Sequence, residues 1–408
     1  MRYYRSGKVS RLPRIRVSRD VNHELMKRRR RPLLPNLTRI HVVSHWNVDP
    51  NMVPMFLPER VTYLALDGYI TPHHKAEGAC FGNFIGGLRH LEHFDSIYLQ
   101  LPDETIRHLT SLPGLRSLKI PIKDFQDLAR ICDPKSNPSY SPQLCSLQTL
   151  HFLCDYLNPG GCSTALESMN PTSLRELRVS SHYGNLSPGE LESLFAALRN
   201  HCDPPSFEAV YFSARDISHT VDTNDWSVHH NTGLEESVNH PPFIIPFRIL
   251  KPFLSDYSSL KFITLPLHLL DADDNEIEQI AAHLPTLRSF ALAANPRNLI
   301  LRPRMTLRSI LSFVTHCPHL SELALYIDAT LPLWPPPESL RHLVHHSLHY
   351  LNLGKSTVAR KDLWKVHDLL DDLLPNLYER IWSTDEPDFD ALSPAEDYWL
   401  EQYYSFGA

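Results

Sequence analysis

A short apolar pattern recurs along the chain, and it constrains the fold more than any other feature of the sequence. Leucine or another apolar residue stands at the first, fourth and sixth positions of each copy. Twelve copies can be placed in the 408 residues. They are Leu37-Ile40-Val42, Val61-Leu64-Leu66, Phe94-Ile97-Leu99, Leu115-Leu118-Ile120, Leu147-Leu150-Phe152, Leu174-Leu177-Val179, Phe207-Val210-Phe212, Leu260-Ile263-Leu265, Leu287-Phe290-Leu292, Leu320-Leu323-Leu325, Leu348-Leu351-Leu353 and a degenerate Leu377-Arg380-Trp382.

The spacing of the copies predicts a stacked repeat rather than leucines scattered through an ordinary α/β domain. Apart from one step of 53 residues, successive copies begin about 29 residues apart on average. That is the long end of the range of roughly 20–29 residues for leucine-rich repeats, in which each unit carries a strand and a helix. We therefore predict an α/β leucine-rich-repeat solenoid of about 12 irregular repeats, with a curved parallel sheet and outer helices.

The segments between copies carry helical signals. Apolar residues recur at helical spacing over residues 188–198, 273–284, 306–315 and 360–374. Ser187 and Glu190 have the spacing of a capping box. Asp271, Asp273 and Asp274 resemble part of a calcium loop, but the glycine and the closing glutamate of such a loop are absent. We expect them to cap the following helix instead.

The residues between the apolar positions of each strand point outward, because side chains alternate faces along a strand. Many of them are tyrosine or arginine, which are enriched at binding hot spots. The alternative is that some of them pack against an insertion or a tail. We predict a partner-binding concave face made of Arg39, His41, Tyr63, Tyr98, Lys119, His151, Glu176, Arg178, Tyr211, Phe262, Tyr326 and Tyr350.

The net charge of −6 is unevenly distributed. Residues 1–31 hold twelve Lys and Arg against two acids, whereas residues 383–408 hold seven acids and no Lys or Arg. We predict a basic N-terminal tail at 1–31, the solenoid at 32–382 and an acidic C-terminal tail at 383–408. The long step gives an insertion at 213–255, whose polar centre, 216–240, is expected to be a projecting loop, with the apolar segment 243–247 restarting the fold.

The basic tail contains an unbroken cationic run. Four interpretations remain open: a solvated tail, a nuclear import signal, a patch for nucleic acid or acidic lipid, and a mitochondrial transit peptide. The residues of the run are Lys27, Arg28, Arg29, Arg30 and Arg31.

The sequence carries no signature of a common enzyme class, such as a P-loop or a zinc-protease helix. His342, His345, His346 and His349 have helical spacing, but a repeat strand begins inside this cluster. We therefore expect a solvated histidine-rich turn rather than a metal site. No enzymatic activity, cofactor or metal is expected.

The seven cysteines include no Cys-x-x-Cys pair, and no signal peptide or membrane-spanning apolar run occurs. Free thiols in a reducing compartment are favoured. Cys202 and Cys317 each precede a repeat strand, and we expect them to be small buried thiols. An intracellular location, cytoplasmic or nuclear, is expected, with no membrane association.

Part of the chain resembles fungal F-box proteins with leucine-rich repeats. The resemblance rests on His283-Leu284-Pro285-Thr286-Leu287, His316-Cys317-Pro318-His319-Leu320-Ser321-Glu322-Leu323-Ala324-Leu325, Ser339-Leu340-Arg341-His342-Leu343, Leu351-Asn352-Leu353-Gly354 and Arg31-Pro32-Leu33-Leu34-Pro35-Asn36-Leu37. In that family the F-box binds a Skp-type adaptor of a ubiquitin ligase, and the repeats select the substrate. Here only 31 residues precede the first repeats, and this segment is strongly basic. We therefore expect an intact F-box to be missing, and with it adaptor binding.

The resulting hypothesis is a non-catalytic, protein-binding repeat scaffold, which by resemblance is an F-box-type substrate-recognition protein of a ubiquitin ligase. The alternative is a nuclear or nucleic-acid-associated scaffold recruited through its basic tail. A protein partner is favoured over a nucleic acid.

Overall fold

A computed structural model describes residues 36–44, 58–68, 85–96, 101–133, 144–156, 158–183, 188–214, 243–265, 268–292, 303–330, 342–354, 356, 358 and 362–382. The described part of the chain divides between two compact units. Unit 1 comprises Met1–Asp155 and Gly161–Leu177, and unit 2 comprises Tyr156–Gly160 and Arg178–Ala408.

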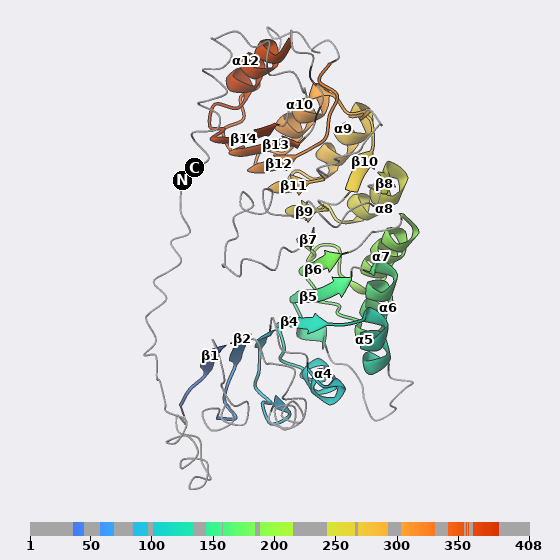
Figure 1. Cartoon of the computed structure of the whole chain (residues 1–408), viewed down its shortest axis with the longest axis vertical. Coiled ribbons are helices and arrows are strands. Elements are labelled where there is room, and N and C mark those ends of the chain that lie inside the picture. The colour runs from blue at the N-terminus through green and yellow to red at the C-terminus, as the bar shows by residue number, and fades with distance from the viewer. Residues whose placement is uncertain are drawn as a thin grey trace, which may run out of the picture. The chain divides into compact units, whose positions relative to one another are not determined.

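Successive repeats contribute successive strands to a long sheet. The order of strands in this sheet, β1-β2-β3-β4-β5-β6-β7-β9-β11-β12-β13-β14, follows the chain (Figure 1). Neighbours pair in parallel, for example β1 with β2 and β11 with β12. The strands are β1 (Arg39–Ser44), β2 (Tyr63–Gly68), β3 (His93–Ser96), β4 (Ser117–Ile122), β5 (Thr149–Tyr156), β6 (Glu176–Tyr183), β7 (Ala209–Ala214), β9 (Phe262–Thr264), β11 (Ser289–Ala291), β12 (Glu322–Ala324), β13 (Tyr350–Gly354) and β14 (Glu379–Trp382).

Helices return the chain from one strand to the next and lie on one side of the strands within each unit (Figure 1). This arrangement confirms the predicted α/β class, with a parallel sheet and outer helices. The helices are α4 (Asp103–Thr110), α5 (Phe125–Cys132), α6 (Pro159–Met169), α7 (Pro188–His201), α8 (Phe247–Asp256), α9 (Asp274–His283), α10 (Leu307–His316) and α12 (Leu363–Leu373). A short 3-10 helix, η3, spans Leu144–Ser146.

The end of the long repeat step folds into two described elements. Strand β8 (Phe243–Pro246) is followed at once by α8, and β8 pairs in parallel with β10 (His268–Asp271). Residues 215–242, which include the predicted projecting loop, lie outside the described residues.

A repeated backbone hydrogen bond fixes the register of the strands. The amide of the second residue of one copy donates to the carbonyl of the second residue of the preceding copy. In unit 1 this ladder runs from Thr62 to Thr38, from Glu92 to Thr62 and from Arg116 to Glu92, with N···O distances of 2.7–2.8 Å. In unit 2 the Arg288 amide donates to the Lys261 carbonyl. The Ser321 amide donates to Arg288, the His349 amide to Ser321 and the Tyr378 amide to His349 in the same way.

This register corrects the third predicted copy. Phe94 pairs with Leu64 on one side and with Leu118 on the other, so it occupies the fourth position of its copy and not the first. The third copy therefore begins at Leu91, which is fully buried. The prediction was wrong because Phe94, Ile97 and Leu99 also satisfy the pattern, and the pattern alone cannot choose between two registers three residues apart.

The apolar positions form the core, as predicted. Leu64, Leu118 and Leu150 in unit 1 and Leu323 in unit 2 are fully buried, as are most of their equivalents. Burying each side chain of this size contributes about 1.5–3 kcal/mol to the stability of the fold. Proline ends three of the helices, because Leu284, Cys317 and Leu374 each precede a proline and have ψ angles of 56°, 74° and 63°, far from helical values.

Candidate protein-interaction face

The outward face is formed by the third and fifth residues of each repeat copy. In β4 the outward Ser117 and Lys119 are half-buried, whereas the inward Leu118 and Ile120 are buried. The helices lie on the inward side of the strands in each unit (Figure 1), and the outward side chains range from exposed to buried. Many predicted site residues lie here, including the exposed His41 and the half-buried His151 and Glu176.

Three outward side chains of unit 1 form a first stack across adjacent strands. The guanidinium carbon of Arg39 lies 4.8 Å from the ring centroid of Tyr63. The Tyr63 ring lies 6.1 Å from the ring of His93, at an angle of 44°. Strand register aligns all three residues at the third position of their copies. The stack holds a cation and two rings in fixed positions on the surface.

Ion pairs follow this stack toward β4. The carboxylate of Asp95 lies 3.5 Å from the ammonium of Lys119, and that of Glu92 lies 3.9 Å from the guanidinium of Arg116. Both pairs join the same two repeats. Partly exposed pairs of this kind add little stability, but they fix the charge pattern of the surface.

A second stack lies in unit 2. The guanidinium carbon of Arg178 lies 4.3 Å from the ring centroid of Tyr211. The Tyr211 ring stacks on Phe262, with centroids 6.0 Å apart and an angle of 29° between the rings. All three side chains are half-buried. The sequence predicted each of these residues singly, and the structure brings them together.

Two further carboxylates lie in the repeats of unit 2, Glu208 at the second position of its copy and Glu322 at the outward third position. Glu208 lies 2.9 Å from the ammonium of Lys261. Glu322 instead accepts a hydrogen bond of 2.8 Å from the hydroxyl of Ser289. Burial raises the pKa of the Glu322 carboxyl, and the hydrogen bond from Ser289 only partly opposes this shift.

Two predicted tyrosines are not accessible. Tyr326 and Tyr350 are 7% and 6% exposed. The phenol oxygen of Tyr350 accepts a hydrogen bond of 3.3 Å from the side-chain amide nitrogen of Asn352, and Asn352 is also buried. Alternation along a strand assigns a side chain to a face, but it does not report whether that face is covered. Tyr98 lies outside the described residues.

The prediction of a solvated histidine turn is wrong for His345, which is 4% exposed. Its Nε2 donates to the carbonyl of Cys317 at 2.9 Å, and its Nδ1 accepts from the amide of Leu348 at 3.2 Å. Because one ring nitrogen donates and the other accepts, the imidazole is neutral. It links the turn at Cys317 to the turn at Leu348. Burial lowers the pKa of His345, and the bond to Cys317 opposes the shift.

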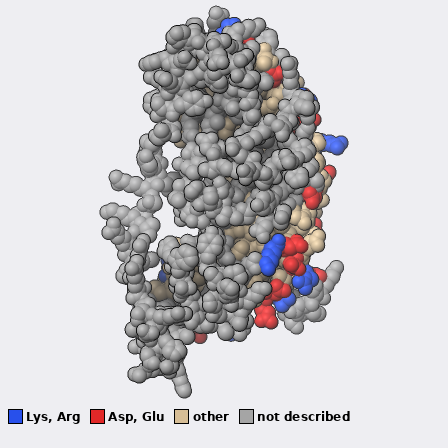
Figure 2. Space-filling model, in the orientation of Figure 1, with Lys and Arg blue, Asp and Glu red and all other residues tan. Residues whose placement is uncertain are grey.

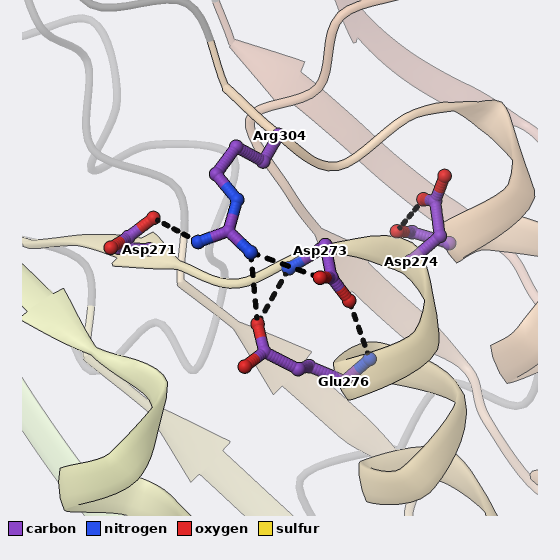
Figure 3. Close-up of polar contacts among 6 residues, drawn as sticks. Asp271, Asp273, Asp274, Glu276 and Arg304 are labelled. Atoms are coloured by element: carbon purple, nitrogen blue, oxygen red, sulfur yellow. Dashed lines mark hydrogen bonds and ion pairs between the residues drawn. The ribbon is translucent and has the colours of Figure 1, made fainter.

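Of the three aspartates predicted to cap a helix, Asp273 does so, at the start of α9 (Figure 3). Asp273 and Glu276 form a capping box at the start of α9, with both bonds 2.9 Å long. Arg304 lies 3.1 Å from Asp271 and 2.9 Å from Asp273. The carboxylates are thus engaged with an arginine and with backbone amides, and the described residues contain no group of three or more potential metal ligands.

The described part of the helix side carries interspersed charges of both signs (Figure 2). Arg130 pairs with Asp127 on α5 at 3.0 Å, and Arg199 of α7 pairs with Asp256 of α8. No described helix has the length and apolar character needed to cross a bilayer. The basic run Lys27, Arg28, Arg29, Arg30 and Arg31 lies outside the described residues.

Sequence reasoning missed several outward residues. His93 and Asp95 were hidden by the wrong register of the third copy. The carboxylates Glu92, Glu208 and Glu322 were also not predicted. Glu322 lies at the outward third position of its copy, and Glu92 and Glu208 lie at the second position. A search for opposite charges at matching positions of successive copies would have found the pair of Glu208 and Lys261, whereas the wrong register of the third copy also hid Glu92.

The strand register, hydrogen-bond ladder and helix placement define an α/β protein of the leucine-rich-repeat class. A scan of protein-family models and a search of curated proteins found no match. Among solved structures, the chain is similar to the leucine-rich-repeat-containing protein LegL7 from Legionella pneumophila. The two are 11% identical, the match covers 90% of this chain and 98% of that chain, and the TM-score is 0.37.

Two other solved structures share this similarity. The plant peptide hormone receptor RGFR1, in complex with RGF2, is 14% identical; the match covers 86% of this chain and 48% of that chain, with a TM-score of 0.36. A chain of the yeast Rad7 and Elc1 complex is 11% identical; the match covers 78% of this chain and 87% of that chain, with a TM-score of 0.24.

Proposed function

We propose that this protein is a non-catalytic scaffold that binds a protein partner through its outward sheet face. The observation that carries the proposal is the pair of cation–aromatic stacks, one in each unit. Tyrosine and arginine dominate the energetics of protein interfaces when they are held in place before binding. The stacks hold Tyr63 and Tyr211 between a cation and a second ring, so a partner need not restrict their motion.

The test is a double variant, Tyr63→Ala with Tyr211→Ala, compared with Trp364→Ala. Trp364 is 44% exposed and lies on α12, on the helix side, so it is a control for loss of a surface aromatic. We expect the double variant to lose the partners that the full-length wild type captures from cell extract, measured by quantitative mass spectrometry. The control should keep them. An unchanged set of partners in the double variant would refute the site.

The more specific proposal is that this scaffold is an F-box-type substrate receptor of a ubiquitin ligase. Its support is the sequence resemblance described above. Co-purification of a Skp-type adaptor with the full chain, retained in the double tyrosine variant, is the result that would support this role. If substrates are captured without the adaptor, the role in a ligase fails while the scaffold function stands.

A second candidate function rests on the charge of residues 1–31, which hold twelve Lys and Arg. We propose that this tail recruits the scaffold to the nucleus or to nucleic acid. Deletion of residues 1–31 should abolish nuclear localisation or salt-sensitive nucleic-acid binding. Retention of both would remove this candidate.

A further inference from the structure

Three carboxylates are each paired with a cation of the next repeat copy: Asp95 at the outward fifth position, and Glu92 and Glu208 at the second position, just before their strands. The pairs are Glu92 with Arg116, Asp95 with Lys119, and Glu208 with Lys261, at 3.9, 3.5 and 2.9 Å. The side chains of these pairs are 23–56% exposed, so the pairs add little stability, but each carboxylate has a cation of the next copy beside it. The pattern is therefore a cation supplied by the neighbouring repeat.

Glu322 departs from this pattern. Strand register places it between Ser289 of β11 and Tyr350 of β13, neither of which is a cation. Among the described residues, its hydrogen-bond partner is the Ser289 hydroxyl, at 2.8 Å from Oε2. Both flanking residues are buried, at 2% and 6% exposure, whereas Glu322 keeps partial access to solvent. Burial raises the pKa of the Glu322 carboxyl despite the hydrogen bond from Ser289.

We propose that Glu322 binds a cationic side chain, arginine or lysine, of the protein partner on the outward face of unit 2. The inference rests on the proposed binding function and specifies the chemistry of one contact. The partner's cation takes the place that Arg116, Lys119 and Lys261 occupy beside the other carboxylates. Charge complementarity at a partly desolvated carboxylate contributes mostly to specificity, because a partner without the cation leaves the charge unpaired.

The probe is a phage-displayed library of random 12-residue peptides, selected on the full-length wild-type chain. Selected peptides are synthesised, and their dissociation constants are measured by fluorescence anisotropy for wild type, Glu322→Gln and Glu278→Gln. Glu278 lies on α9, paired with Arg308 on the helix side, and its substitution makes the same change in charge. The Ser289 hydroxyl can still donate to the glutamine amide oxygen at position 322, and thermal unfolding verifies that each variant is folded.

We expect the peptides to share an arginine or lysine at a fixed position. Replacing that residue by glutamine, or Glu322 by glutamine, should weaken binding at least tenfold, and combining the two changes should add little. Glu278→Gln should bind like the wild type. Exchange of arginine for lysine in the peptide then tells whether a two-pronged guanidinium or a point charge is preferred.

Different results would separate the two proposals. Peptides that lose affinity for Tyr211→Ala but bind Glu322→Gln like the wild type would overturn the role of Glu322 and leave the binding face intact. Selected peptides with no recurrent basic residue would also overturn it. Peptides whose binding is unaffected by both Tyr211→Ala and Glu322→Gln would overturn the binding face itself, and the role of Glu322 with it.

Discussion

Both ring nitrogens of His345 are engaged, and its own amide donates to the carbonyl of Leu373 at 2.9 Å. The residue therefore ties the turn at Cys317 to the end of α12. Protonation of the ring would convert Nδ1 from an acceptor into a donor that faces the Leu348 amide. The environment contains no described compensating acid, since the charged groups that act on His345 are the histidines His319, His346 and His349.

This arrangement predicts that stability falls in mild acid. The pKa of His345 is lowered from 6.5 in the folded protein, so the unfolded chain takes up the proton first as pH falls. The neutral ring contributes fully to the free energy of unfolding above pH 6.5, the pKa of the unfolded chain. This contribution is lost as pH falls through the lowered pKa of His345 in the folded protein. We expect the free energy of unfolding to decrease from pH 7.5 to pH 5.5, measured by denaturant titration, and to decrease less in His345→Gln.

His108 is expected to contribute to the same pH dependence, because burial and the charge of Arg89 also lower its pKa. Its ring lies in unit 1, whereas His345 lies in unit 2. His345→Gln should thus remove only part of the pH dependence, and the double variant with His108→Gln should remove more. An identical pH dependence in wild type and His345→Gln would rule out the role of the neutral ring.

Among the elements, α9 and α10 are joined at their first turns. Asp274 accepts hydrogen bonds from the amide and the hydroxyl of Thr306, at 2.8 and 2.7 Å, and from the hydroxyl of Ser309 at 2.6 Å. Thr306 is also the cap of α10, and its hydroxyl accepts from the amide of Arg308. One carboxylate thereby orders the start of the next repeat's helix.

Asp274→Ala should destabilise unit 2 by about 1–3 kcal/mol, because it leaves the fully buried hydroxyl of Ser309 without its acceptor. Asp274→Asn should cost less, since its amide oxygen can still accept. The measurement is equilibrium unfolding in urea, with Glu278→Gln on the exposed side of the same helix as control. Equal stability of Asp274→Ala and the control would refute this role for the carboxylate.

The elements that the sequence predicted are those with local signals. Helices α7, α9, α10 and α12 have apolar periodicity over their whole length, and Asp273 has a capping residue three positions on. Helix α8 was missed because Pro252 stands inside it and it follows a polar interval. The cation–aromatic stacks could not be predicted as stacks, because each joins residues from three strands whose register is set by the backbone ladder.

At the scale of the whole molecule, the ladder among the described residues links each repeat directly to its neighbour. The Thr62, Glu92 and Arg116 amides of unit 1 show this, as do the Arg288, Ser321 and His349 amides of unit 2. In such an array, stability is a sum of the repeats' own stabilities and the nearest-neighbour contacts. A substitution that destabilises one repeat should therefore also destabilise the adjacent repeats, and this effect should decrease with distance along the chain.

Two equivalent core positions test this, Leu118 in unit 1 and Leu323 in unit 2, both fully buried. Each substitution by alanine should cost about 2–5 kcal/mol, because it removes buried methyl groups and leaves a cavity. Hydrogen exchange read by mass spectrometry should show Leu118→Ala losing protection mainly in β3, β4 and β5, and Leu323→Ala mainly in β11, β12 and β13. Wild-type protection should persist in the unsubstituted unit. Equal loss across both units in either variant would instead show that the chain unfolds as one cooperative body, and additivity from repeat to repeat would not apply.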